Sequence, residues 1–179
     1  LGPLHGVFSH LQAFAIQSQL NLDQSIISAQ YRDRTRGLDS LINTLDDNSK
    51  LPKITDISAL WQLLQQEMIE SGKTRQFQAD VIDLDGKREI QTVTRIGTFN
   101  LIANGEYLKY QGIDSDLARL NRQPDTKYLE AASLLNTDTQ TGGTSSPREA
   151  FAFGIDPTGP KGGSFLSALI STPSLSERI

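Results

Sequence analysis

A glycine-rich stretch at residues 159–164 (GPKGGS) holds the residues closest to a chemical motif. A phosphate-binding loop needs backbone amides around the phosphates and a lysine directly before the hydroxyl that holds magnesium. Here Lys161 lies three residues before Ser164, and Pro160 removes one amide donor. No buried strand is expected before the stretch. The spacing therefore favours a turn followed by a helix cap over nucleotide binding.

Residues 83–86 (DLDG) resemble the middle of a calcium-binding loop. Such a loop also needs an acidic first ligand and a bidentate glutamate at its twelfth position. Val81 and Thr92 occupy those two places. Because Asp85-Gly86 is also a strong signal for a tight turn, the sequence predicts a β-hairpin here.

The remaining ionisable groups indicate no catalytic or metal site. His5 and His10 would point roughly 140° apart on a helix, so they cannot hold one metal ion together. The chain has no cysteine, which excludes disulfides and thiolate metal sites. Asp46 and Asp47 lie beside a predicted helix end and are expected to be solvated. The sequence thus predicts no catalytic, cofactor-binding or metal-binding residue and no cofactor.

Composition indicates a packed domain, or one domain with a helical extension. The chain has 179 residues, 37% of them hydrophobic and 21% charged. Its net charge of −4 argues against nucleic acid or an anionic membrane surface as a partner. The basic cluster Arg32, Arg34 and Arg36 is interleaved with Asp33 and is expected to be solvated. No apolar run approaches the roughly 18–20 residues that cross a bilayer.

The apolar residues recur with helical spacing in several segments. The pattern predicts helices over 4–20, 35–47, 56–71 and 126–136. In the segment 56–71, Thr55 or Asp56 is expected to cap the first amides, and Gly72 to adopt a left-handed conformation after the last turn. Trp61 lies on the apolar stripe of this segment, which predicts a core position.

Between these helices the pattern changes to the period of a strand. Phe77, Ala79 and Val81 alternate with polar residues, and a β-rich run over 88–103 has an expected kink at Gly97. Asn104-Gly105 is a second hairpin signal, followed by a strand over residues 107–110. The predicted fold class is α+β, with amphipathic helices packed on an antiparallel β-meander of three or four strands.

The chain divides into four segments by composition. We expect a helical N-terminal segment over 1–50 and an α+β core domain over 51–136. A polar, flexible loop is expected over 137–150, and an extended segment with a short helix over 151–179. Phe151 and Phe153 in the last segment either anchor it to the core or dock a partner.

Several stretches resemble the periplasmic region of proton-channel proteins of the MotA/TolQ/ExbB family. They are ISAQY at 27–31, LWQLLQQEMIESGK at 60–73, VTRIGTFNLIANGEYLKY at 93–110 and FGIDPTGPKGGSFLSALISTPSLSERI at 153–179. The last stretch includes Ser174 and Glu177, spaced as in a capping box. In the family, a segment like it leads into the first membrane helices.

The resemblance implies a periplasmic domain of a protein anchored in the inner membrane by segments outside this chain. It also implies that the helical segment over 1–50 continues from a coiled coil upstream. It implies ExbB, ExbD and TonB-like proteins as partners, an iron–siderophore transport role, and homo-oligomerisation of the full-length protein. The expected function is a non-catalytic interaction module. A periplasmic small-ligand sensor that gates the complex is the alternative, with Phe99, Tyr107 and Tyr110 lining a pocket. A cell-wall hydrolase is the least favoured hypothesis.

Overall fold

A computed structural model describes residues 2–47, 51–121, 123–137 and 153–155. Within these residues the chain forms five helices and five strands. The helices are α1 (Gly2–Gln24), α2 (Ile27–Gln30), α3 (Gly37–Asp46), α4 (Ile54–Ser71) and α5 (Thr126–Thr137). The strands are β1 (Thr74–Ile82), β2 (Arg88–Ile96), β3 (Asn100–Ala103), β4 (Glu106–Lys109) and β5 (Leu117–Arg119).

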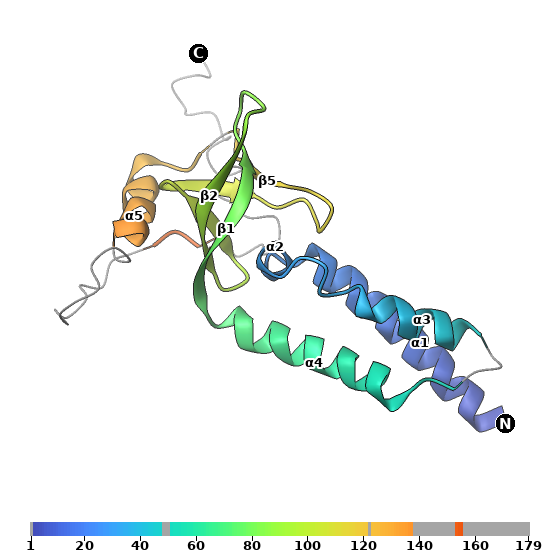
Figure 1. Ribbon diagram of the computed structural model, residues 1–179. Helices are drawn as coiled ribbons and strands as arrows, with labels where there is room; N and C mark the ends of the chain where they lie inside the picture. Colours follow the sequence, from blue (N-terminus) through green and yellow to red (C-terminus); the bar gives the residue numbers. More distant parts are fainter. Residues whose placement is uncertain (1, 48–50, 122, 138–152, 156–179) are drawn as a thin grey trace, which may run out of the picture.

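Three long helices project from one end of a small barrel (Figure 1). α1 and α4 run in the same direction, toward the barrel, and α3 runs in the opposite direction and packs against both. Their shared core is formed by buried leucines and an alanine, with Leu38, Leu41 and Leu45 contributed by α3. These leucines recur every three or four residues, which places them on one face of α3. The predicted helices over 35–47 and 126–136 are confirmed as α3 and α5.

The five strands close into a barrel. β1 pairs antiparallel with β2 along its whole length, and β2–β3, β3–β4 and β4–β5 continue as antiparallel neighbours. The barrel closes because β5 pairs in parallel with β1, through Val81↔Leu117 and Ile82↔Ala118. The predicted antiparallel meander of three or four strands is therefore wrong. A three-residue strand is too short to show an alternating pattern, and its partner lies far away in the sequence.

The interior of the barrel is filled by apolar side chains from all five strands. Val81, Val93, Leu101, Leu108 and Leu117 are buried there, together with Ala103 and Tyr110. The end of the barrel that faces the helices is closed by Ile26 and Ala29, from the turn after α1 and from α2. The helices and the barrel therefore share one continuous core at this junction.

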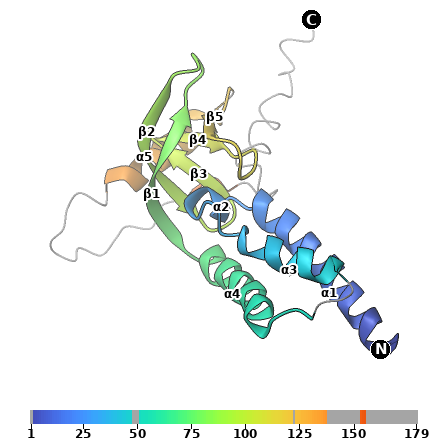
Figure 2. The same cartoon turned by 45° about the vertical axis from the view of Figure 1, so that its right-hand side comes forward.

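α5 covers the outside of the barrel on another side (Figure 2). Ala132 of α5 packs with Ile102 and Tyr107, whose side chains point outward from β3 and β4. The ring of Phe153 stacks on that of Tyr107 with centroids 5.9 Å apart, and the Tyr107 hydroxyl donates to the Gly154 carbonyl at 3.0 Å. Phe153 therefore anchors its segment to the core, whereas Phe151 lies outside the described residues.

The tight turns follow the sequence signals. Gly86 has φ 77°, and the Asp83 amide donates to the Lys87 carbonyl at 2.9 Å, which confirms the first hairpin. Asn104 and Gly105 have φ 51° and 79° and link paired residues of β3 and β4, as a two-residue hairpin requires. Gly97, with φ 53°, breaks the run over 88–103 into β2 and β3.

The ends of α4 differ from their prediction. The helix begins at Ile54 after Lys53, and no side chain caps its first amides, so neither Thr55 nor Asp56 is the N-cap. Gly72 has φ −91° and is not left-handed, because the chain turns directly into β1.

Several predictions concern residues that the structure does not describe. The loop over 137–150 and the segment over 151–179 fall almost entirely outside the described ranges. The same is true of the glycine-rich stretch 159–164 and of the capping box at Ser174 and Glu177. These interpretations, and the division at residues 50 and 51, stay predictions.

Candidate functional site

α4 exposes a stripe of large apolar side chains. Trp61 is 58% exposed and Met68 63%, and Ile57 beside them is 37% exposed. The core of the helical bundle instead takes Leu60, with Leu63 packed against it. The predicted core position of Trp61 is thus wrong. The apolar stripe of α4 is wider than the part that its neighbours cover. Periodicity alone does not show which edge of the stripe stays exposed.

α1 shows the same arrangement. Its buried side includes Leu11 and Ala15. The flank toward α3 is marked by side-chain hydrogen bonds, from Gln12 to Asp46 at 3.2 Å and from Gln19 to Asp39 at 2.7 Å. Val7 and Phe14 lie on the opposite flank and are 59% and 53% exposed.

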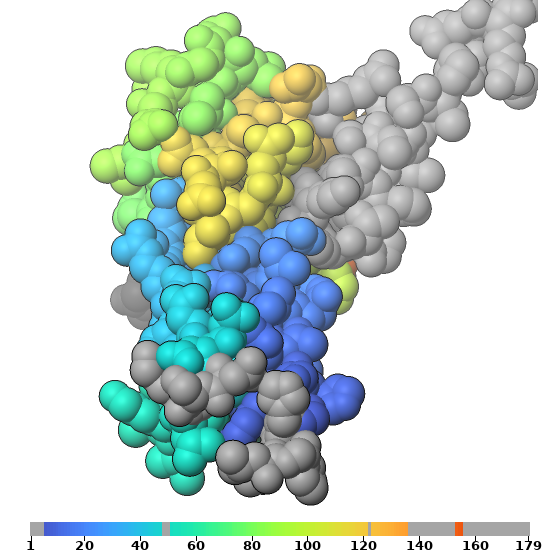
Figure 3. Space-filling model, turned by 90° about the vertical axis from the view of Figure 1, so that its right-hand side faces the viewer, coloured from blue at the N-terminus to red at the C-terminus, as the bar shows by residue number. Residues whose placement is uncertain are grey.

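The two exposed flanks turn toward the same side of the bundle. Viewed from its N-terminal end, a right-handed helix advances clockwise by about 100° per residue. Ile57, Trp61 and Met68 of α4 therefore lie clockwise of Leu60. Val7 and Phe14 of α1 lie anticlockwise of Ala15. Figure 3 looks toward the free ends of the helices, with α1 on the right, α4 at the lower left and α3 above α4. In that view both displacements point to the lower right, away from α3.

We call this surface the apolar face, and define it by five side chains: Val7, Phe14, Ile57, Trp61 and Met68. The Ser25 hydroxyl, just after α1, donates to the Glu67 carboxylate of α4 at 2.6 Å. Phe14 and Ile57 lie about the same number of turns before that contact, so the two helices present their apolar side chains at matching heights. Apolar surface gathered in this way, with a tryptophan near its centre, is typical of a protein-binding site.

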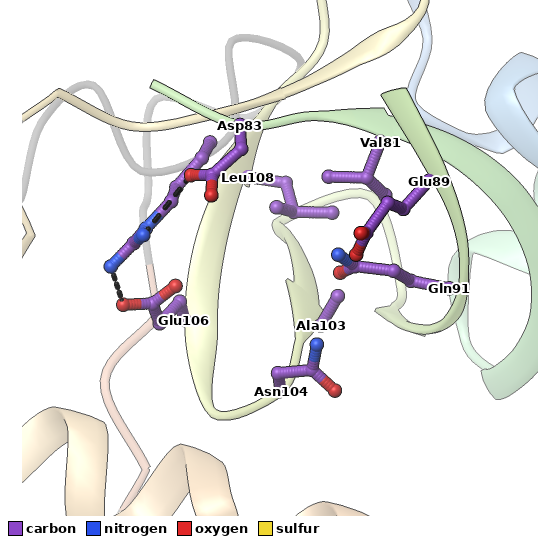
Figure 4. Close-up of a pocket in the computed structure, with 9 residues that line it drawn as sticks. Val81, Asp83, Glu89, Gln91, Ala103, Asn104, Glu106 and Leu108 are labelled. Atoms are coloured by element: carbon purple, nitrogen blue, oxygen red, sulfur yellow. Dashed lines mark hydrogen bonds and ion pairs between the residues drawn. The ribbon is translucent and has the colours of Figure 1, made fainter. Parts of the chain in front are cut away.

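A second candidate is a pocket at the end of the barrel away from the helices (Figure 4). Its volume is about 210 Å³, and it is lined by Val81, Asp83, Glu89, Gln91, Ala103, Asn104, Glu106, Leu108 and Arg119. Asp83 and Glu106 lie on one side of it and Glu89 and Gln91 on the other. Polar side chains from β2, β4 and β5 and from two turns thus surround a small apolar floor.

The charges of this pocket are paired with one another. Arg119 bonds to Asp83 at 3.1 Å and also to Glu106. The Leu84 amide and then Arg119 hold the pKa of Asp83 below its ordinary value. Glu89 is paired with Lys87. A carboxylate with a lowered pKa is a poor general acid or base near neutral pH, so the arrangement fits binding of a small polar molecule better than acid–base chemistry.

A buried ion pair joins the barrel to α4. Arg95 of β2 is fully buried and donates to Glu70 at 2.7 Å, to the carbonyls of Glu70 and Gly97 at 2.9 and 2.8 Å, and to Gln30 at 3.1 Å. Lys73 bonds to the same carboxylate at 2.8 Å, and this bond is the main cause of the lowered pKa of Glu70. Burial lowers the pKa of Arg95, and Glu70 opposes that effect. Because its donors are used by the protein itself, the pair is structural.

The basic cluster over residues 32–36 is only partly solvated. Arg34 is buried and bonds to Glu67 at 2.6 Å and to the Ser28 hydroxyl at 2.8 Å. The prediction of a solvated segment is therefore wrong for this residue, although Arg36 is largely exposed. Alternating charges in the sequence gave no signal that a glutamate in α4 would lie opposite Arg34.

The structure separates the aromatic residues that were expected to line a pocket. Tyr107 points outward under α5, whereas Tyr110 lies in the barrel core, and its hydroxyl donates to the Asp23 carbonyl at 3.0 Å. Burial raises the pKa of each tyrosine to about 12. Phe99 is 37% exposed in the turn before β3 and does not line the barrel-end pocket.

The other residues singled out from the sequence do not come together. His5 and His10 both lie in α1, and Asp46 and Asp47 at the end of α3. Across the described part of the chain, no group of three histidine, aspartate or glutamate residues is placed to hold a metal ion. Among the described helices, none combines the length and the apolar character needed to cross a bilayer.

Comparison with known proteins adds no family to these observations. No protein-family model, curated protein or solved structure matches the chain.

Proposed function

We propose that this chain is a non-catalytic periplasmic interaction domain of an ExbB/TolQ-like inner-membrane protein in a TonB-dependent system. The observation that carries the interaction role is the apolar face on α1 and α4, where large side chains including Trp61 are exposed together. The choice of family rests on the sequence resemblance alone, which is strongest to the TtpC proteins of TonB systems. In this proposal the partners are ExbB, ExbD and TonB-like proteins, and the transported substrates are iron–siderophore complexes.

The resembling stretches coincide with the parts of the fold that matter for this role. The stretch at 60–73 forms most of α4 and includes Trp61, Met68 and the buried Glu70. The stretch at 93–110 covers the end of β2, all of β3 and β4, and the buried Arg95. The resemblance therefore involves both the exposed apolar face and the ion pair that fixes α4 on the barrel.

The test uses the full-length protein in cells that depend on it for siderophore uptake. Trp61→Gln with Met68→Gln should reduce uptake and weaken co-purification with ExbD and TonB, because the complex cannot assemble fully without the apolar contacts of this face. The matched control is Ile90→Gln on β2, which also replaces an exposed apolar residue but lies on the barrel. Normal uptake and co-purification by the double variant would refute the proposal.

The barrel-end pocket favours a second candidate function, a small-ligand sensor that gates the complex. Its polar lining and its volume of about 210 Å³ suit a small polar molecule. Screening siderophores, peptidoglycan fragments and metal ions should raise the melting temperature if one of them binds. The Gln91→Ala variant should lose that increase. An unchanged melting temperature with every compound would count against this function.

A further inference from the structure

We infer that the apolar face is the surface through which two copies of this chain associate. This inference deepens the proposed interaction function by naming the occupant of the face. The occupant is a second copy of the same chain, so that α1 and α4 of one copy pack against α1 and α4 of the other. Three properties of the face favour a second copy as its occupant: its size, its lack of charge and its position on the molecule.

The size of the face matches one half of a homodimer interface. With its five side chains between 37% and 63% exposed, the face offers apolar surface on the order of 500 Å². A standard interface buries roughly 800 Å² on each partner, and in homodimers about 65% of it is apolar. The apolar part of one partner is therefore roughly 500 Å², which this face provides without help from the barrel.

The composition of the face allows it to meet itself. The first charged side chain along α1 is Asp23, since residues 2–22 contain no lysine, arginine, aspartate or glutamate. On the exposed side of α4, the residues around Trp61 and Met68 are Ser58, Gln62 and Gln65. In a two-fold interface each side chain meets the same surface of the partner, so like charges would repel. An uncharged face avoids that cost, and it offers no attraction to a strongly charged partner.

The position of the face leaves it open to a second copy. The exposed flanks of α1 and α4 point away from α3, and α3 makes its contacts with the other sides of both helices. The barrel contributes none of the five side chains. Two bundles can therefore pack side by side with four helices in the interface, an arrangement in which each helix gains a buried neighbour.

Trp61 gives a direct signal for this association, because it is the single tryptophan of the chain. The 179-residue chain is examined by sedimentation equilibrium between about 1 µM and about 100 µM, a range that covers moderate affinities. We expect the mass to approach that of two copies as the concentration rises. Over the same range the tryptophan emission should move to shorter wavelength, and acrylamide should quench it less.

Two variants locate the surface. Phe14→Gln keeps Trp61 as the reporter and should hold the chain at the monomer mass, with red-shifted emission at every concentration. Ile90→Gln replaces an apolar residue that is 73% exposed on β2 and should dimerise as the original chain does. The tryptophan signal of the unmodified chain needs no variant, so a folding defect in Phe14→Gln leaves that test intact.

Two results would overturn the inference. One is a monomer at all concentrations with an unchanged tryptophan spectrum. The other is a dimer in which Trp61 stays as accessible to acrylamide as in the monomer, because a different surface would then be in use. Either result would leave ExbD or TonB as the protein that covers the face, and the co-purification experiment tests that possibility separately.

Discussion

At the scale of single residues, one charged side chain is completely shielded from solvent. Arg95 is fully buried between β2 and α4, and Glu70 is its anionic partner. A guanidinium group that loses its carboxylate in such a place remains charged and unsolvated. The burial of Arg95 was hard to predict from the sequence, because an arginine in a strand usually faces water. Its only signal was that Arg95 shares the inward side of β2 with Val93.

Replacing Glu70 tests the importance of this pair. Glu70→Ala should lower the free energy of unfolding by about 3–5 kcal/mol, since Arg95 is left buried without its partner. Chemical denaturation at neutral pH measures the change. Glu130→Ala, at an exposed site on α5, is the control and should change stability by no more than about 0.5 kcal/mol. Equal effects of the two substitutions would show that the pair contributes nothing specific.

The lowered pKa of Glu70 also predicts how stability depends on pH. The folded protein holds this carboxylate ionised below its ordinary pKa of 4.5, chiefly through Lys73. Its contribution is therefore present above pH 4.5 and is lost as the pH falls through the lower pKa of the folded state. Melting temperatures measured from pH 7 downward should fall less steeply for Glu70→Gln than for the original chain in this acid range. Parallel curves would contradict the assignment.

Gly97 tests the close approach of the turn after β2 to the end of α4. Its φ is 53°, and a Cβ atom there would lie 2.5 Å from the carbonyl oxygen of Ser71. Gly97→Ala should therefore lower the free energy of unfolding by more than the roughly 1–2 kcal/mol that a left-handed alanine alone costs. Gly86→Ala is the matched control, because Gly86 has φ 77° and a Cβ there would contact nothing within 4 Å. Thermal denaturation measures both variants, and an equal loss of stability in the two would argue against the steric contact at Gly97.

At the scale of elements, the short strand β5 decides the architecture. It has three residues, yet its pairing with β1 and β4 converts a meander into a closed barrel. Closure removes the exposed edges that β1 and β4 would otherwise present. Leu117 of β5 is fully buried in the barrel core, where it packs with residues of the other strands.

Truncating Leu117 should therefore destabilise the protein strongly, although its strand is short. Leu117→Ala should lower the free energy of unfolding by about 2–5 kcal/mol, as for other fully buried leucines. Amide hydrogen exchange should also quicken in β1 near Val81, where β5 pairs. Leu84→Ala in the exposed hairpin turn is the control and should leave both measurements nearly unchanged. Unaltered exchange in β1 would mean that β5 does not hold the barrel closed.

The sequence predicted the elements that depend on local signals. The helices follow from the spacing of leucines such as Leu38 and Leu41, and the hairpins follow from Asp85-Gly86 and Asn104-Gly105. The sequence pattern did not predict β5, because its pairing with β1 is a long-range contact and three residues are too few to show a strand period. It misplaced Trp61 for a related reason, since a wide apolar stripe does not show which of its edges the neighbouring helices cover.

At the scale of the whole molecule, one end of the helical bundle packs against the barrel. Ile26 and Ala29 fill that end of the barrel, and the Arg95–Glu70 pair ties it to α4. The apolar face lies on the projecting helices and faces away from α3. The domain therefore presents this face at a fixed position relative to the barrel. The candidate site was not predictable from sequence, since the pattern had assigned Trp61, its largest side chain, to the core.

In the proposed complex, a protein covers the apolar face. Because the chain has no cysteine, Met68→Cys places a single thiol of this domain on the face, and Ile90→Cys places one on the exposed barrel. The most direct measurement is the rate at which a membrane-impermeant maleimide labels each thiol in the native membrane and in the dilute isolated chain. We expect similar labelling rates at the two positions in the isolated chain, and slower labelling of position 68 alone in the membrane. Equally fast labelling of both positions in the membrane would contradict it.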